Sequence, residues 1–316
     1  MSSPPSSRAA AANGSVAPVA PDPAAQFRTI RALWDEAFDV VHLHEPLAPG
    51  PTVTSLLLKP APLVGTFHAA GSQPAYTAMK PLVQWGARRL DLRVAVSEDA
   101  RDLARDHLDG DYELMFNGVE VQRFASAEPW PTDGPTVLFV GRHEPRKGLD
   151  VLLSALEELP AEVRIWVAGT GPDTDALQAR FTDERIEWLG RIDDHERDRR
   201  LAGADVFSAP SLGGESFGVI LLEAMAARTP VVASDIPGYT KVATAPAPDG
   251  SVPPEPAALL APVGDAAALA DRLRRVLGDP AEAARQRDLG WERVQPFDVE
   301  RLTDLYLQRY HQLVAG

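Results

Sequence analysis

Short apolar runs alternate with longer amphipathic segments along most of this 316-residue chain. Runs rich in Val, Ile, Leu and Phe predict strands, and apolar positions spaced three or four residues apart predict helices between them. The predicted strands cover residues 38–43, 63–66, 92–96, 113–116, 137–140, 163–168, 186–189, 206–209 and 231–233. Such alternation is typical of an α/β protein with parallel, doubly wound sheets.

The strands fall into two sets, and 316 residues are enough for two domains that each bury a core. An Asn-Gly pair and several prolines between Asn117 and Pro135 mark the boundary between the sets. We expect a first domain over residues 26–120, a second over 121–296, and a C-terminal helix over 297–316 that packs back on the first. Residues 1–25 are mostly Ala, Pro and Ser and are expected to be disordered.

Composition removes several classes of protein. The chain has no cysteine, which excludes disulfides and thiolate metal sites. Its net charge of −14 disfavours a nucleic-acid partner and gives no overall attraction to an anionic membrane. The apolar runs are short, so we expect no transmembrane helix.

Two carboxylates stand eight residues apart in the stretch 213–226, at Glu215 and Glu223. Eight residues make just over two helical turns, so we expect both on one side of a helix, Glu215 at its entrance and Glu223 two turns in. The glycines before Glu215 let backbone N–H groups approach a ligand, and a helix N-terminus favours anions. The stretch suits a sugar attached to a diphosphate, although an amphipathic helix with a capping carboxylate explains it equally well.

A second suggestive stretch, Gly-Arg-His-Glu-Pro-Arg-Lys-Gly, occupies residues 141–148 directly after a predicted strand. Ligands of open α/β sheets bind beyond the carboxyl ends of strands, where Arg142 and Lys147 would offer two cations to a diphosphate. Taken alone, a solvated loop that pairs its charges with Glu144 is the simpler interpretation. The binding interpretation gains because Glu215 also follows a predicted strand.

These stretches, with Gly-Thr-Gly at 169–171 and Thr-Pro-Val-Val-Ala-Ser at 229–234, resemble the nucleotide-sugar half of retaining family 4 glycosyltransferases. That family has the glycosyltransferase B fold, two Rossmann-like domains whose parallel sheets face a cleft. Residues 39–46, 65–68, 117–119 and 212–218 are most similar to the GDP-mannose-dependent phosphatidylinositol mannosyltransferases. The resemblance therefore implies a retaining enzyme that moves mannose from GDP-mannose to a phosphatidylinositol-type lipid.

The resemblance also implies a role for each matching residue. Arg142 and Lys147 would hold the diphosphate, Glu215 the hydroxyls of the sugar, and Glu223 the ribose, while His68 would face the sugar and the acceptor across the cleft. The implied catalytic residues are Arg142, Lys147, Glu215 and His68, and the implied donor-binding residues are Gly141, Arg142, Lys147, Gly190, Arg191, Ile192, Gly214, Glu215, Ser216, Phe217, Gly218 and Glu223.

No metal ion is expected to be required. The sequence has Asp-x-Asp spacing at Asp109 and Asp111 and again at Asp173 and Asp175, as in metal-dependent glycosyltransferases. The first pair is predicted in a turn and the second at the start of a helix, which favours structural roles. The implied partners are instead the nucleotide-sugar donor, a lipid or glycan acceptor and, by peripheral contact, the cytoplasmic face of the inner membrane, with no nucleic acid.

The chain departs from the family pattern at its beginning. It starts where the family's first strand and Gly-Gly loop are nearly over, so we expect an incomplete first domain. The helix that should attract anionic lipid offers only Arg28 and Arg31, followed at once by Asp35 and Glu36. Two alternatives stay open: a hexosyltransferase that uses another nucleotide sugar or a soluble acceptor, and a truncated, catalytically impaired protein that binds nucleotide sugar.

Overall fold

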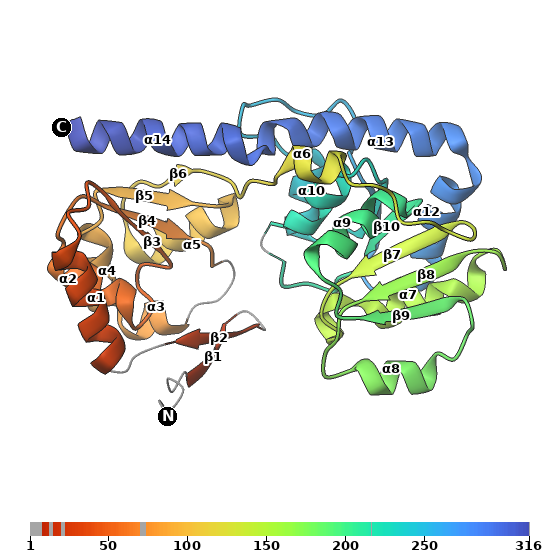
Figure 1. Cartoon of the computed structure of the whole chain (residues 1–316), viewed down its shortest axis with the longest axis horizontal. Helices are drawn as coiled ribbons and strands as arrows, with labels where there is room; N and C mark the ends of the chain where they lie inside the picture. Colours follow the sequence, from red (N-terminus) through yellow and green to blue (C-terminus); the bar gives the residue numbers. More distant parts are fainter. Residues whose placement is uncertain (1–7, 13–14, 20–22, 70–73, 216, 316) are drawn as a thin grey trace. The chain divides into compact units, whose positions relative to one another are not determined.

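The computed structural model of the chain describes residues 8–12, 15–19, 23–69, 74–215 and 217–315. The chain divides into two compact units (Figure 1). Unit 1 comprises Met1–Phe116 and Leu302–Gly316, and unit 2 comprises Asn117–Arg301. The C-terminal segment, which we expected to pack on the first domain, is thus grouped with unit 1.

Unit 1 is built on a four-stranded parallel sheet in the order β3-β4-β5-β6. Its strands are β3 (Val41–His44), β4 (Leu63–Phe67), β5 (Leu92–Ala95) and β6 (Glu113–Leu114). The helices of unit 1 are α1 (Pro23–Asp35), α2 (Pro51–Leu58), α3 (Pro74–Ala78), α4 (Lys80–Arg88), α5 (Glu98–Leu108) and most of α14 (Val299–Ala315).

Both faces of this sheet are covered. One face packs in a cluster that includes Leu63, Phe67 and residues of α4 and α5. On the other face, Val64 and Val94 contact Tyr306, Tyr310 and Leu313 of α14. These three residues recur at helical spacing, so one face of α14 is partly buried against the sheet.

The N-terminal segment differs from its expected disorder where it is described. Strands β1 (Arg8–Ala12) and β2 (Ser15–Val19) pair in antiparallel register, with Arg8 opposite Val19. This pairing satisfies backbone N–H and C=O groups of both strands. Residues 1–7, 13–14 and 20–22 of that expectation lie outside the described residues.

Unit 2 is built on a six-stranded parallel sheet in the order β12-β11-β10-β7-β8-β9. Its strands are β7 (Thr136–Val140), β8 (Arg164–Ala168), β9 (Ile186–Gly190), β10 (Val206–Ala209), β11 (Val231–Ser234) and β12 (Leu259–Ala261). β12 was not predicted, because three residues after a proline-rich segment give no periodicity. Counted along unit 2, the order is 3-2-1-4-5-6, that of a Rossmann fold, with the direction of winding reversing between β7 and β10.

The sheet of unit 2 is buried by helices on both faces (Figure 1). The helical elements are α6 (Val121–Ala125), η1 (Pro145–Lys147), α7 (Leu149–Ala155), η2 (Leu156–Glu158), α8 (Thr174–Arg180), α9 (Asp194–Gly203), α10 (Val219–Ala226), α11 (Pro237–Thr244), α12 (Ala266–Gly278), α13 (Pro280–Val294) and η3 (Gln295–Phe297). Asp193, Asp265 and Asp279 cap α9, α12 and α13 by accepting backbone N–H bonds, which fixes where these helices begin. In the described part of the chain, no helix is both long and apolar enough to cross a membrane.

Candidate active site

The loops after β7 and β10 meet at the point where the strand order of unit 2 reverses. A Cβ atom added to Gly148, which has φ 64°, would lie 2.0 Å from the carbonyl oxygen of Pro210. The backbone N–H of Leu212 donates to the carbonyl of Arg146 over 2.7 Å. Only glycine at position 148 allows this close approach. Gly148 therefore lets the stretch 141–148 contact the segment that leads into the stretch 213–226.

The contact assembles a small network of charges. Nζ of Lys147 and Nη1 of Arg146 lie 2.6 Å and 2.8 Å from Oε1 of Glu215, whose side chain is 15% exposed. Nε of Arg146 lies 2.7 Å from Oε1 of Glu144. Arg142 is 54% exposed and its Nη1 lies 3.8 Å from Oε2 of Glu144, too far for a strong hydrogen bond. Three cations thus face two carboxylates, which leaves a positive surplus suited to an anion.

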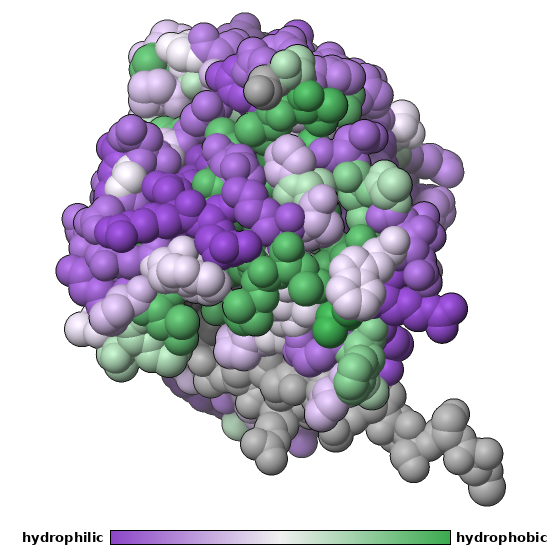
Figure 2. Space-filling model, turned by 90° about the vertical axis from the view of Figure 1, so that its left-hand side faces the viewer, coloured by the Kyte–Doolittle hydropathy of each residue, from purple (hydrophilic) through white to green (hydrophobic). Residues whose placement is uncertain are grey.

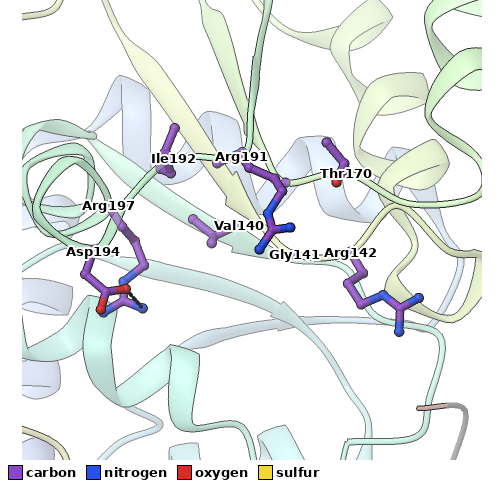
Figure 3. A pocket seen from close by; sticks show the side chains of 10 residues that line it. Val140, Gly141, Arg142, Thr170, Arg191, Ile192, Asp194 and Arg197 are labelled. Atoms are coloured by element: carbon purple, nitrogen blue, oxygen red, sulfur yellow. Dashed lines mark ion pairs between the residues drawn. The ribbon is translucent and has the colours of Figure 1, made fainter. Parts of the chain in front are cut away.

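A pocket of about 520 Å³ opens beside this network (Figure 3). It is lined by Val140, Gly141, Arg142, Ala168, Gly169, Thr170, Arg191, Ile192, Asp194 and Arg197. The Arg191 side chain extends toward Val140 and Gly141, while Arg197 and Asp194 pair across another part of the wall at 3.3 Å. The pocket therefore combines backbone from three strand ends with several cations, a lining suited to a nucleoside diphosphate.

The prediction that Glu215 and Glu223 share a helix is wrong. α10 begins at Val219, so Glu215 lies in the preceding loop and Glu223 one turn into the helix. Gly213, Gly214 and Gly218 have φ values of 156°, 75° and 86°, and these conformations prevent the helix from starting earlier. Burial raises the pKa of the half-buried Glu223, and the nearby Arg197 opposes this shift.

The remaining predicted donor residues fall around the same loops. Gly190 ends β9 and its carbonyl accepts the N–H of Gly169 at 2.7 Å. Phe217 is buried, and the centre of its ring lies 5.8 Å from that of Phe297. Gly218 is the N-cap residue of α10, and a Cβ atom added to it would lie 2.7 Å from the Tyr239 ring. Ser216 lies outside the described residues.

Sequence reasoning missed three residues of this region. Arg146 pairs with Glu215, and Asp194 and Arg197 line the pocket. On the same helix as Asp194 and Arg197, Arg200 is only 5% exposed and lies between the rings of Trp130 and Trp166. Arg146 could have been identified, because it lies within the stretch 141–148 that the sequence analysis singled out. Asp194 and Arg197 could not, because they reach the pocket from α9 and no neighbouring sequence pattern indicates that contact.

His68 lies in unit 1, directly after β4. Its backbone N–H donates to Oε1 of Glu45 at 2.8 Å, and its Nε2 lies 2.8 Å from Nδ1 of His44. Burial, and then the proximity of His44, lowers the pKa of His68. Among the side chains that the structure describes, no group of three His, Asp or Glu is placed to hold a metal ion.

Comparisons with known proteins agree with this geometry. Residues 8–123 match the family model "Glycosyltransferase Family 4" and residues 134–279 match "Glycosyl transferases group 1". The chain is 39% identical to the phosphatidyl-myo-inositol mannosyltransferase of Mycobacterium leprae over 96% of this chain and 81% of that protein, and 36% identical to its namesake from Mycolicibacterium smegmatis over 96% and 78%.

Among solved structures, sucrose-phosphate synthase from Thermosynechococcus elongatus is similar at a TM-score of 0.72 and 25% identity. The match covers 92% of this chain and 76% of that one. Two parallel α/β sheets, matches to both family models and 39% identity to a named transferase agree with one another. The chain belongs to the family 4 glycosyltransferases and has their two-domain B fold.

Proposed function

We propose that this glycosyltransferase transfers mannose from GDP-mannose to a phosphatidylinositol-type lipid with retention of the anomeric configuration. Relatives at 36–39% identity are named phosphatidyl-myo-inositol mannosyltransferases. The observation that carries the donor half of the proposal is the pairing of Lys147 and Arg146 with Glu215 beside the pocket of unit 2.

The proposed donor lies with its nucleoside in the pocket and its diphosphate at the loop after β7. Arg191 and Ile192 line the part of the pocket assigned to the base. Glu223, which lies near enough to Arg197 for their charges to interact, is assigned to the ribose. Arg142 and Lys147 bind the diphosphate. Charge-assisted bonds to phosphate are stronger than neutral ones, so donor phosphate competes for Lys147.

Release of Lys147 toward phosphate leaves Glu215 held by Arg146 and able to accept hydrogen bonds from the sugar hydroxyls. The bond between the anomeric carbon and the β-phosphate oxygen then breaks as the acceptor oxygen bonds to the same face of the sugar. The acceptor proton passes to the departing phosphate oxygen. Arg142 and Lys147 stabilise the charge that develops there, which is the main task of such a site. His68, at the end of β4, is assigned to the acceptor side.

Peripheral contact with an anionic membrane is part of the proposal. Phe27 and Trp34 of α1 are each 72% exposed, and Arg28 and Arg31 stand on the same helix. Figure 2 shows the face of unit 1 that carries α1 and α2, where hydrophobic residues gather beside strongly hydrophilic ones. Exposed aromatic and basic residues on one helix favour the membrane interface, although Arg31 also pairs with Asp35 at 2.9 Å.

The test is transfer of labelled mannose to phosphatidylinositol vesicles, with the product identified by mass and its anomeric configuration by the one-bond carbon–proton coupling at the anomeric carbon. We expect a mannosyl lipid of α configuration from GDP-mannose, and little product from UDP-glucose. Equal transfer from UDP-glucose, or transfer to soluble inositol phosphate that vesicles do not increase, would contradict the donor or the acceptor assignment respectively.

A further inference from the structure

Two histidines meet where β3 and β4 end in unit 1. His44 is the last residue of β3, His68 follows β4, and Nδ1 of His44 lies 2.8 Å from Nε2 of His68. Two imidazole nitrogens at this distance form one N–H···N bond, so one carries the proton and the other accepts it. The tautomer of one ring therefore determines the tautomer of the other: if Nδ1 of His44 carries the proton, Nε2 of His68 must accept it, and the reverse.

The backbone around the pair is fixed by Glu45. This residue has φ 50°, a left-handed conformation that non-glycine residues rarely adopt and that the surrounding hydrogen bonds hold in place. Its N–H donates to the carbonyl of Thr66 at 2.8 Å, and its Oε1 accepts the N–H groups of His68 and Ala69 at 2.8 Å and 2.7 Å. The Glu45 carboxylate thus clamps the segment after β4 to the end of β3.

A third histidine supports the pair from one side. His42 stacks on His44 with ring centroids 4.6 Å apart, and its Nδ1 and Nε2 lie 2.6 Å and 2.7 Å from Tyr310 Oη and Thr66 Oγ1. Burial, with His44 and His68 nearby, lowers the pKa of His42 to about 4. His42 is therefore neutral near pH 7 and packs as a fixed ring beneath His44.

The surroundings disfavour a state in which both His44 and His68 are positively charged. Three groups of residues surround this cluster: Glu45 binds the backbone of His68, Tyr306 and Tyr310 of α14 contact His42, and Tyr76 of α3 lies close enough to Glu45 for their charges to interact. Glu45 is the one carboxylate of this set, and its Oε1 already accepts two backbone N–H groups. Two protonated imidazoles at 2.8 Å would repel each other and lose their hydrogen bond.

We propose that His44 is a positioning residue that fixes the ring orientation and tautomer of His68 for the acceptor side of the reaction. The inference rests on the proposed function, which assigns His68 to that side. With Nε2 of His68 bound to His44, its Nδ1 faces the substrate with one defined role, donor or acceptor. Among the described residues, none hydrogen-bonds to that Nδ1.

Three substitutions of His44 separate positioning from simple packing. His44→Phe keeps a ring to stack on His42 but removes the hydrogen bond to His68. His44→Asn places an amide nitrogen where Nδ1 stood and can restore the bond. His44→Gln reaches further, to the position of Nε2, and serves as the matched polar control.

We expect His44→Phe to lower kcat about 10- to 100-fold with KM for GDP-mannose unchanged, the scale of losing a neighbour that orients a functional histidine. His44→Asn should recover kcat to within about 3-fold of wild type, and His44→Gln should resemble His44→Phe. Loss of the neighbouring imidazole also removes one cause of the lowered pKa of His68, so the acid limb of the kcat–pH profile should move to higher pH in His44→Phe.

Nitrogen-15 NMR of the histidine rings reads the tautomer directly and does not depend on turnover. We expect a single neutral tautomer for His68 in wild type and in His44→Asn, and averaged nitrogen shifts in His44→Phe. Wild-type kcat and pH profile in His44→Phe, beside an inactive His68→Ala, would overturn the inference and leave the proposed function standing. Averaged shifts for His68 in the wild-type protein would overturn it even if His44→Phe fails to fold.

Full activity of His68→Ala would remove the acceptor-side role of His68 and the inference with it, while mannose transfer itself would persist. Absence of mannose transfer by the wild-type chain would contradict the proposed function separately. The tautomer measurement distinguishes these failures, because it is made without substrate.

Discussion

Replacing Gly169 by alanine tests whether the two strand ends that wall the pocket depend on close backbone approach. Gly169 follows β8 with φ 122°, and a Cβ atom there would lie 1.8 Å from the carbonyl oxygen of Gly141 and 2.9 Å from its carbonyl carbon. Gly141 and Gly169 both line the pocket. The substitution therefore affects the donor site and the end of the sheet together.

The magnitude follows from the contacts. Carbon and oxygen approach to about 3.3 Å in ordinary contacts, so the loops must separate by roughly 1.5 Å. An alanine at this φ costs about 1–3 kcal/mol in backbone strain. Separation also weakens the bonds from Gly141 N–H to Ala168 (3.0 Å) and from Gly169 N–H to Gly190 (2.7 Å), each contributing about 1 kcal/mol. We expect the free energy of unfolding to fall by about 3–5 kcal/mol.

Urea unfolding measures the stability change, and calorimetric titration with GDP measures the pocket. Gly278→Ala is the matched control, because Gly278 ends α12 with no atom within 4 Å of the added Cβ, and its stability should stay within about 1 kcal/mol of wild type. We expect Gly169→Ala to lose at least about 10-fold in GDP affinity, which corresponds to 1.4 kcal/mol. If Gly169→Ala keeps the stability and the GDP affinity of wild type, the pocket does not depend on close packing of the backbone at Gly169 against Gly141.

Three further predictions concern the charges and the buried polar groups. Lys147→Ala and Glu215→Ala should each lower kcat at least ~100-fold in the transfer assay, and near-normal rates in both would contradict the site. Burial lowers the pKa of His42 to about 4 in the folded state, from 6.5 in the unfolded state. Between pH 6.5 and pH 4 the unfolded chain therefore binds a proton at His42 that the folded chain does not bind. Wild type should thus lose about 2 kcal/mol of stability between pH 6.5 and pH 4, and His42→Phe should lose less when urea midpoints are compared, whereas equal losses would contradict this cause. Arg200→Ala should cost about 2–4 kcal/mol in urea unfolding, against at most about 0.5 for the exposed control Arg164→Ala in the same unit, and similar costs would show that stacking between the tryptophans contributes little.

The strands were largely predictable, because buried parallel strands are continuous apolar runs. The strand at Leu259–Ala261 was missed, since three residues are too few to show a period. The start of α10 was misplaced because the helix pattern extends back through Glu215. The positive φ values of the glycines, which stop the helix at Val219, depend on contacts made in the folded chain.

The candidate site was predictable where its residues follow strand ends. Arg142, Lys147 and Glu215 lie in the segments that follow β7 and β10, and the fold brings these segments together. Arg197 reaches the pocket from α9, and Arg200 stacks on two tryptophans far away in sequence. Such contacts depend on how the helix packs, which a single sequence does not encode locally.

Calorimetric titration of the purified chain with GDP, GDP-mannose and UDP-glucose is the most direct test of whether unit 2 binds a guanine nucleotide sugar. We expect GDP and GDP-mannose to bind at one site per chain, and UDP-glucose to bind at least about 10-fold more weakly. We also expect Lys147→Ala to weaken the binding of both guanine ligands. Absence of binding by all three ligands, or a preference for UDP-glucose, would contradict the proposed donor.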